Sequence, residues 1–586
     1  MKGKKRKIRF AILGLMVWIM GTGMADGQVL NRALSFGKTG IVECGVIDDL
    51  KGNDSYSLQF QVNPAVWKEG ASLISLGKNF NVKLGKPGEI IFTSGKSKLK
   101  AISPDLSADK WNQITLICDK GTARVLFNGK EVAHGKLNAL PDSGSALTLG
   151  GNYSGLLDEI RLWDSALNDD MKKFDYFTQN TLNKWCPMWE NLVVYYKMDQ
   201  ELDGRIVDYK ELIDLTDGNE KDSAGGKDGK ANGKLLKGEK GFALEYPNGS
   251  AHNHGLMKGD VKRVEAQNDK MPYLINGAYI QTDRALNWNI PADQYLLSNQ
   301  LLILGADACA DGHIVEKTPN NHGDLPKIYE GRGGIKVFMC IQGTYRVRDK
   351  FGDWREILGD KEKHRIFAED LAALSKDYDG LELDLEWIEE PVQWEQFGQL
   401  AQEIRKRLPA EKEFRISLHN NYSDFPAEDM DVVDGFTFQQ YGPNPKNFSY
   451  ANYLQNVEKF LKRYEKEKIL TSYSTTTSRG EGGSPVLMIR FDVLNDYEEN
   501  DKDVDIYNNE KDTWSYMGPM QVFKRAKHTR ENNLAGIFYW DIAGDNREGS
   551  ASDNEEESLE GFNQAKYCSY GINANNEVII ERISDR

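Results

Sequence analysis

The sequence lacks the cysteine spacings that mark metal and redox sites. Its 586 residues include six cysteines, but no two of them form a C-x-x-C pair. This excludes the common zinc and dithiol motifs, and we expect neither a metal nor an organic cofactor. The cysteines lie far apart, at positions 44, 118, 186, 309, 340 and 568. Export would permit a disulfide, for example Cys309 with Cys340, although a chain of this length does not need one.

Positive charge is scarce relative to negative charge, and long apolar runs are missing beyond the first twenty residues. There are 74 Lys and Arg against 89 Asp and Glu, a net charge of −15 at pH 7. An acidic chain is a poor partner for nucleic acid or an anionic membrane. Without a further apolar run of about 20 residues we expect no membrane insertion. The 40% hydrophobic content instead indicates a globular protein of two or three domains.

The first 25 residues are typical of a secretory signal peptide. A basic run, Lys2–Arg9, precedes an apolar segment, Phe10–Met20, and small residues lead to Ala25. The apolar segment is shorter than a membrane-spanning helix requires. The sequence therefore predicts a signal peptide at 1–25 and a secreted protein, located in the periplasm or at the cell surface of a bacterium.

Residues 26–250 have the pattern of an all-β domain followed by a linker. Short alternating runs such as Tyr56–Val62 and Gln113–Cys118 are separated by glycine, asparagine and proline. This pattern predicts a β-sandwich or jelly roll. The pair Asn128-Gly129 lies within the apolar segment Arg124–Val132 and predicts a tight hairpin. The Gly-, Lys- and Asp-rich stretch at 217–241 is predicted to be a surface loop or linker.

Two segments of this domain resemble the laminin-G and concanavalin-like sandwiches. They are G-L-L-D-E-I-R-L-W-D-S-A-L at 155–167 and W-N-Q-I-T-L from Trp111. Residues 191–246 are expected to close the same sandwich or to form a partial second one. The resemblance implies a domain that binds carbohydrate or protein, and the alternative is a spacer that buttresses the next domain.

From residue 256 to residue 566 strand and helix patterns alternate, which predicts a (β/α)8 TIM barrel, followed by a tail at 567–586. The eight expected strands are Tyr273–Gln281, Leu301–Asp307, Ile335–Gln342, Gly380–Glu386, Phe414–His419, Gly435–Tyr441, Lys468–Ser474 and Leu534–Trp540. An acidic, glycine-containing segment at 475–512 is predicted either to shape a cleft or to be disordered.

The fourth expected strand carries the most informative pattern in the chain. It reads D-G-L-E-L-D-L-E-W from Asp379 to Trp387. Leucines at 381, 383 and 385 alternate with carboxylates at Glu382, Asp384 and Glu386. An edge strand with solvated carboxylates is the commoner outcome, but helical patterns at 366–378 and 394–408 flank this strand and favour a parallel sheet. The carboxylates then face a barrel interior, where crowding raises at least one pKa and Glu386 is best placed to act as an acid.

At these residues the chain resembles glycoside hydrolase family 18, whose fourth strand carries D-x-x-D-x-D-x-E. The match places Asp379, Glu382, Asp384 and Glu386 on the motif, with glutamate replacing the family's middle aspartate. The resemblance implies that Glu386 is the catalytic acid and base, and that Asp384 holds the substrate acetamido group. It implies supporting roles for Glu382 and Asp379 toward Asp384.

The sixth strand shows the same alternation of apolar and polar residues, which predicts that Thr437, Gln439 and Tyr441 face inward. By resemblance, Tyr441 and Gln439 fix the acetamido carbonyl oxygen. Chitinases of the family commonly show M-x-Y-D here and S-x-G-G on the third strand. This chain has Q-Q-Y-G at 439–442 and C-I-Q-G at 340–343, which is more similar to the endo-β-N-acetylglucosaminidases that cut N-glycans.

Other strand-end residues are candidate sugar contacts. Trp540 ends the eighth strand and matches the tryptophan that floors the family's substrate site, although a core tryptophan is the alternative. Trp387, Tyr473 and Asn420 are further candidates. For Asn420 and its neighbour His419, the favoured alternative is that they satisfy buried polar neighbours.

The resemblance implies substrate-assisted, retaining hydrolysis through an oxazolinium intermediate, with no cofactor. We therefore expect a secreted endo-β-N-acetylglucosaminidase that cleaves between the two core N-acetylglucosamines of N-glycans on glycoproteins. The alternative enzyme is a chitinase acting on chitin oligosaccharides. The alternative from another class is a catalytically silent, lectin-like glycan-binding protein, against which the presence of Glu386 argues.

Overall fold

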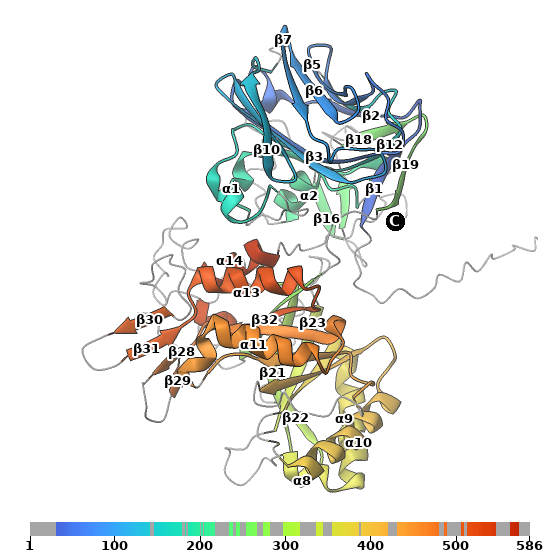
Figure 1. The fold of residues 1–586 in the computed structure, drawn as a ribbon. Coiled ribbons are helices and arrows are strands. Elements are labelled where there is room, and N and C mark those ends of the chain that lie inside the picture. Colours follow the sequence, from blue (N-terminus) through green and yellow to red (C-terminus); the bar gives the residue numbers. More distant parts are fainter. Residues whose placement is uncertain are drawn as a thin grey trace, which may run out of the picture.

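The computed structural model describes most of the chain as two domains (Figure 1). The described residues are 31–140, 146–177, 182, 186–199, 201–202, 204–216, 234–237, 242–245, 254–266, 274–281, 297–316, 336–343, 354–385, 388, 390–419, 430–442, 444–479, 486–488, 505–508, 513–545 and 563–572. The predicted signal peptide therefore lies outside the described residues. None of the helices within these ranges is long and apolar enough to cross a membrane.

The N-terminal domain is the predicted β-sandwich, built from two antiparallel sheets. One sheet has the order β10-β9-β8-β3-β12-β1-β19, with β13 also paired to β12, and the other has the order β14-β15-β18-β2-β11-β4-β5-β6-β7. The first sheet comprises β1 (Arg32–Phe36), β3 (Tyr56–Pro64), β8 (Asn112–Asp119), β9 (Thr122–Phe127), β10 (Lys130–Lys136), β12 (Gly155–Trp163), β13 (Leu192–Tyr196) and β19 (Val261–Glu265). The second comprises β2 (Ile41–Val46), β4 (Ser72–Leu76), β5 (Phe80–Leu84), β6 (Glu89–Ser94), β7 (Ser97–Ile102), β11 (Ala146–Gly150), β14 (Glu201–Leu202), β15 (Arg205–Ile206) and β18 (Gly255–Lys258).

The predicted hairpin joins β9 to β10. Asn128 and Gly129 both have positive φ, at 48° and 77°. This is the combination that a two-residue turn between antiparallel strands requires, and it explains the choice of asparagine and glycine. Between the sheets, alternate side chains of each strand form one continuous apolar core.

The sandwich extends further along the chain than the predicted boundary at residue 250. β18 pairs with β2, and β19 pairs with β1. Residues 255–265 therefore belong to the sandwich, and the first barrel strand begins at Ile275. β13 pairs with β12 in the first sheet, and β15 pairs with β18 in the second sheet. The segment after residue 191 therefore closes the same sandwich. Beside the sheets lie α1 (Asp169–Lys173), α2 (Tyr209–Thr216) and the hairpin of β16 (Lys234–Lys237) and β17 (Phe242–Glu245).

The second domain is a closed barrel of eight parallel strands. It closes because β20 pairs with both β21 and β32. In chain order the strands are β20 (Ile275–Gln281), β21 (Gln300–Ala308), β23 (Lys336–Gln342), β24 (Gly380–Leu385), β25 (Glu413–His419), β26 (Gly435–Gln439), β27 (Ile469–Ser474) and β32 (Gly536–Trp540), with β22 (Ile314–Glu316) antiparallel to β21. All eight predicted strands are confirmed, with bounds shifted by a few residues at most.

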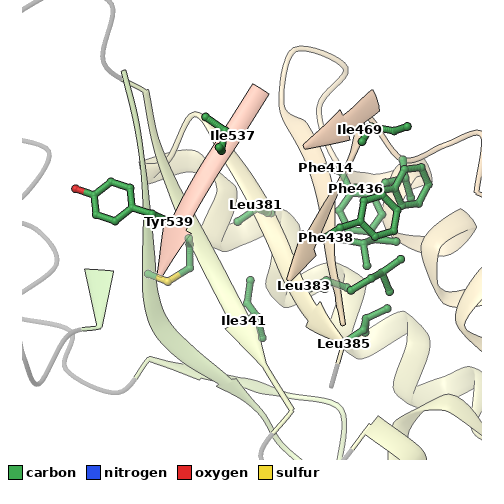
Figure 2. Packing of buried hydrophobic residues seen from close by; sticks show 14 of the residues in the cluster. Ile341, Leu381, Leu383, Leu385, Phe414, Phe436, Phe438, Ile469, Ile537 and Tyr539 are labelled. Atoms are coloured by element: carbon green, nitrogen blue, oxygen red, sulfur yellow. The ribbon is translucent and has the colours of Figure 1, made fainter. Parts of the chain in front are cut away.

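Helices cover the outside of the barrel. They are α8 (Trp354–Leu358), α9 (Lys361–Leu374), α10 (Pro391–Arg407), α11 (Tyr450–Leu461), α13 (Pro519–Glu531) and α14 (Asn563–Ile572). The leucines of β24 face these helices, as their alternation predicts. Figure 2 shows Leu383 and Leu385 gathered with Phe414, Phe436 and Phe438 on this side of the strands. The opposite side of β24 therefore carries its carboxylates into the barrel.

The barrel interior is packed with aromatic and apolar side chains around one buried arginine. Arg415 donates to Gln300 Oε1 at 2.7 Å and lies over the Phe338 ring at 4.3 Å. It also pairs with Glu413, which Lys336 contacts at 2.8 Å. Burial acts to raise the pKa of Glu413, but the charges of Arg415 and Lys336 outweigh it and lower that pKa to about 2. These groups lie at the N-terminal ends of their strands and close that end of the barrel.

The segment after β27 contains a four-stranded antiparallel sheet, so the alternative of disorder is wrong for the described part of residues 475–512, and the alternative that the segment shapes a cleft stays a prediction. Its strands are β28 (Thr477–Arg479), β29 (Val486–Met488), β30 (Asp505–Asn508) and β31 (Thr513–Tyr516). All six cysteines are free, so Cys309 and Cys340 form no disulfide. The reason is that Cys340 points into the barrel toward Glu382, whereas Cys309 lies beyond the end of β21.

Candidate active site

The candidate site lies where the strands of the barrel end. Asp384 is level with Ser417 of β25 on one side and with Gln342 of β23 on the other. Gln439 of β26 is level with His419. Because side chains in register on neighbouring parallel strands share one layer, polar groups from four strands meet at this mouth.

Two of the predicted catalytic residues are in direct contact. Gln439 Nε2 donates to Asp384 Oδ1 at 2.9 Å and to Ser417 Oγ at 3.0 Å. Gln439 is buried, while Asp384 is only partly buried. The contact fixes the orientation of the carboxylate. A carboxylate held this way can accept a hydrogen bond from an amide N–H.

The end of β24 is anchored by a residue that the sequence did not single out. Trp354 of α8 is buried and donates through Nε1 to the backbone oxygen of Asp384 at 3.0 Å. Gly343, the last residue of C-I-Q-G, makes room for this ring, since a Cβ there would lie 2.4 Å from Trp354 Nε1. The departure from the chitinase pattern on the third strand therefore keeps a glycine where the backbone passes an indole closely.

Glu382 lies fully buried one layer below Asp384. Its carboxylate accepts hydrogen bonds from the Tyr279 hydroxyl and from Thr437 Oγ1, the latter at 2.8 Å. Burial raises the pKa of Glu382, although the two hydroxyls act against this. The predicted support for Asp384 is therefore not a direct hydrogen bond, because both oxygens of Glu382 are used by residues inside the barrel.

Asp379 does not support the site. It precedes β24, is exposed, and accepts a hydrogen bond from the backbone nitrogen of Val337 at 2.8 Å. It thus holds β23 and β24 together at the N-terminal ends of the strands, opposite the mouth that carries Asp384. The expectation failed because Asp379 shares the parity of the outward-facing leucines, not that of Glu382 and Asp384, and because it lies at the wrong end of the strand.

Trp540 and Tyr441 both lie at the mouth. Tyr441 is the second residue after the end of β26 and is buried. Trp540 ends β32, is partly exposed, and its ring centroid lies 5.7 Å from that of Tyr279. Its backbone oxygen accepts from Thr475 N at 2.8 Å and from Ser474 Oγ at 3.0 Å, and the Trp540–Asp541 peptide bond is cis. A partly exposed indole at a strand end suits contact with a sugar face.

Tyr473 is not a sugar contact. It is fully buried on the outer side of β27, and its ring stacks on Tyr539 at 5.0 Å. Leu470 points into the barrel, and a residue three positions further along a strand points the opposite way. His419, at the end of β25, is partly buried, and its Nε2 lies 3.3 Å from the backbone oxygen of Gly442. Burial lowers the pKa of His419.

Three predicted residues, Glu386, Trp387 and Asn420, lie outside the described residues. Tyr279, Ser417 and Trp354 are partners of the site that the sequence analysis missed. Tyr279 and Ser417 lie on the inward positions of predicted strands, so the alternation could have identified them. Trp354 could not have been found this way, since a single tryptophan in a short helix carries no such signal. Within the described ranges, no group of three or more His, Cys, Asp or Glu is arranged to hold a metal ion.

Comparison with known proteins supports the sandwich directly. Residues 36–171 match the Concanavalin A-like lectin/glucanases superfamily. This agrees with the resemblance seen at 155–167 and at Trp111. No curated protein matches the chain.

Solved structures resemble the chain only distantly. A class V chitinase from Nicotiana tobaccum is 14% identical, with 51% of this chain and 99% of that chain covered and a TM-score of 0.39. A glycoside hydrolase family 18 N-acetylglucosaminidase from Paenibacillus barengoltzii is 14% identical, covering 50% and 99%, with a TM-score of 0.39. An immunomodulatory active chitinase from Trichuris suis is 14% identical, covering 50% and 99%, with a TM-score of 0.43. Matches this weak say nothing of the reaction.

Proposed function

We propose that the barrel is a glycosidase that hydrolyses the β-1,4 bond between the two core N-acetylglucosamines of N-glycans on glycoproteins. The observation that carries this proposal is the hydrogen bond from Gln439 to Asp384 at the barrel mouth. It orients a carboxylate at the mouth, the group needed to accept a hydrogen bond from the N–H of an acetamido group.

The chemistry follows from where charge develops. Glu386, one residue beyond β24 in the sequence, would protonate the glycosidic oxygen and later accept a proton from water. The acetamido oxygen of the substrate would attack C1 and form an oxazolinium ion, so configuration is retained without a covalent enzyme adduct. Asp384 would accept the acetamido N–H and stabilise the positive charge, and Tyr441 would hold the carbonyl oxygen. Trp540 would lie under the sugar ring.

The N-glycan core is proposed over chitin because of two residues. Gln439 replaces the methionine common in chitinases, and its amide contacts Asp384. Gly442 replaces the aspartate that stands three positions after the methionine in the M-x-Y-D pattern. The proposal includes export, with residues 1–25 removed as a signal peptide, which the mass of the protein recovered outside the cell would test.

The test is mass spectrometry of an N-glycosylated protein after incubation with the full chain, beside the variant Glu386→Gln. We expect glycopeptides left with a single N-acetylglucosamine in the first sample and intact glycans in the second. Glu386→Gln is nearly isosteric and removes the acid, so release should fall by at least about 100-fold. Unchanged release by the variant would remove Glu386 from the mechanism.

Other results of this experiment would support a chitinase or a lectin instead. High-mannose, hybrid and complex glycans are tested separately, because loops set the glycan class. Release of chitobiose from chitin oligosaccharides, with no action on glycoproteins, would make the chain a chitinase. Binding of glycans without cleavage of any of these substrates would make it a lectin.

A further inference from the structure

The sandwich contacts the barrel through a buried aromatic cluster centred on one ring, that of Phe174. Phe174 directly follows α1 and lies among three aromatic residues of α13 and α14. Its ring centroid is 5.3 Å from Phe523, 5.3 Å from Tyr567 and 4.3 Å from Tyr570. All of these side chains are buried. Figure 1 shows the sandwich seated over α13 and α14 in this region.

Charge and hydrogen bonding reinforce this contact. The carboxylate of Asp175 pairs with Lys527 and lies 3.7 Å from Arg530, both on α13. On the sandwich side, Gln59 of β3 donates through Nε2 to the backbone oxygen of Tyr176 at 2.8 Å. The segment 174–176 is therefore held between the sandwich sheet on one side and the barrel helices on the other.

The first turn of α14 is attached to the ends of the barrel strands. Asp545 is buried, and its carboxylate accepts from the backbone nitrogens of Gln564 at 3.2 Å and Ala565 at 2.9 Å. The side chain of Gln564 donates to the backbone oxygens of Ser474 at 3.1 Å and Met517 at 2.6 Å. Carboxylates at the start of a helix are stabilised by the free N–H groups there.

Those strand ends hold Trp540. Thr475 Oγ1 lies 3.1 Å from the Trp540 oxygen and accepts from Asp541 N at 2.9 Å. Ser474, whose oxygen Gln564 binds, donates to the same Trp540 oxygen. A continuous set of contacts therefore runs from Phe174 through α14 to the backbone of Trp540.

We infer that the sandwich is a positioning element of the active site, because docking Phe174 on α14 holds the helix that fixes the strand ends carrying Trp540. The kinetic part of this inference rests on the proposed function. Side chains that touch the substrate work only when their supporting contacts hold them within a fraction of an ångström. Phe174 and Asp545 are then positioning residues, and the sandwich buttresses the barrel.

The experiment compares two full-length variants by hydrogen exchange. Phe174→Ala removes the docked ring, and Phe80→Ala removes an equally buried ring of the sandwich core that contacts Tyr56. We expect Phe174→Ala to speed exchange of the amides of Thr475, Asp541 and the first turn of α14 about tenfold or more. Phe80→Ala should leave these amides unchanged, and Phe174→Tyr should restore them.

Kinetics give the second readout. With an N-glycan substrate, Phe174→Ala should raise KM about tenfold and change kcat less, because Trp540 contributes binding to the sugar. Normal exchange at Asp541 and an unchanged KM in a folded Phe174→Ala chain would overturn the inference. If that variant does not fold, Asp175→Arg breaks the same contact from a partly exposed position and is judged by the same two criteria. If the unmodified chain cleaves no glycan, the proposed function fails and the exchange result still decides the positioning role.

Discussion

The hydroxyl of Tyr279 donates a hydrogen bond to the carboxylate of Glu382 inside the barrel, across from β20 to β24. Thr437 of β26 binds the other oxygen of the same carboxylate. Glu382, which stands where the family 18 motif has aspartate, thus links β24 to β20 on one side and to β26 on the other. Its extra methylene gives it the reach to meet both hydroxyls.

Glu382→Asp, which introduces the aspartate that the family 18 motif has at this place, should destabilise this protein. The shorter side chain cannot keep both hydroxyl partners, and a buried polar group without a partner costs about 1–3 kcal/mol. Glu382→Gln keeps the length and serves as the matched control, with a smaller loss expected. Urea unfolding followed by circular dichroism measures both. An aspartate variant as stable as the glutamine variant would contradict this account of the glutamate.

Gln439→Leu should lower kcat about 100-fold with an N-glycan substrate, because removing one oriented donor at a site of developing charge typically costs this much. Ser417→Ala is the control. It removes only the second acceptor of Gln439 Nε2 and leaves the contact with Asp384. We expect its kcat to fall by less than about tenfold. A leucine variant with normal kcat would separate Gln439 from catalysis.

Trp540→Phe should change KM strongly, and Tyr473→Phe should change it little. Trp540 is partly exposed at the mouth, so a smaller ring should raise KM about tenfold through lost contact with the sugar. Tyr473 is fully buried on the other side of the strands, so losing its hydroxyl should change kcat and KM less than twofold. Steady-state kinetics on the same substrate measure both. A large effect at Tyr473 alone would reverse the assignment.

The barrel could be predicted because the alternation of apolar and polar residues is visible within each strand's own sequence. Leucines of β24 and phenylalanines of β26 alternate with polar residues, and this period is set by the backbone alone. The same alternation predicted that Glu382, Asp384 and Gln439 share the interior. The prediction for Tyr473 was wrong, because Tyr473 lies three residues after the inward-pointing Leu470 and therefore faces outward.

The features that could not be predicted depend on contacts between residues far apart in the sequence. β19 belongs to the sandwich only because it pairs with β1, more than 200 residues earlier in the chain. Residues 567–572, predicted as part of a tail, belong to α14, whose tyrosines are buried against Phe174 of the other domain. No local pattern reports a partner that lies so far away in the sequence.

The last prediction concerns Asp545, whose burial raises its pKa from 3.8 to about 7 despite the hydrogen bonds from Gln564 and Ala565. The folded chain therefore holds this proton more tightly than the unfolded chain does. The free energy of unfolding should fall as pH rises from about 4 to about 7, by up to about 4 kcal/mol from this group, and level off above that. The buried neighbours Tyr473, Tyr539 and Cys568 do not titrate in this range, since burial raises their pKa values.

Asp545→Asn isolates this contribution, because asparagine keeps one acceptor for the first turn of α14 but has no proton to lose. Other carboxyl groups give both proteins the same remaining pH dependence, so the difference between the two unfolding curves is what matters. We expect the stability of the variant relative to the unmodified chain to rise steadily from pH 4 to pH 7, measured by urea unfolding at fixed ionic strength. Parallel curves would show that Asp545 is ionised in the folded chain throughout, and that the start of α14 stabilises its charge more strongly than burial opposes it.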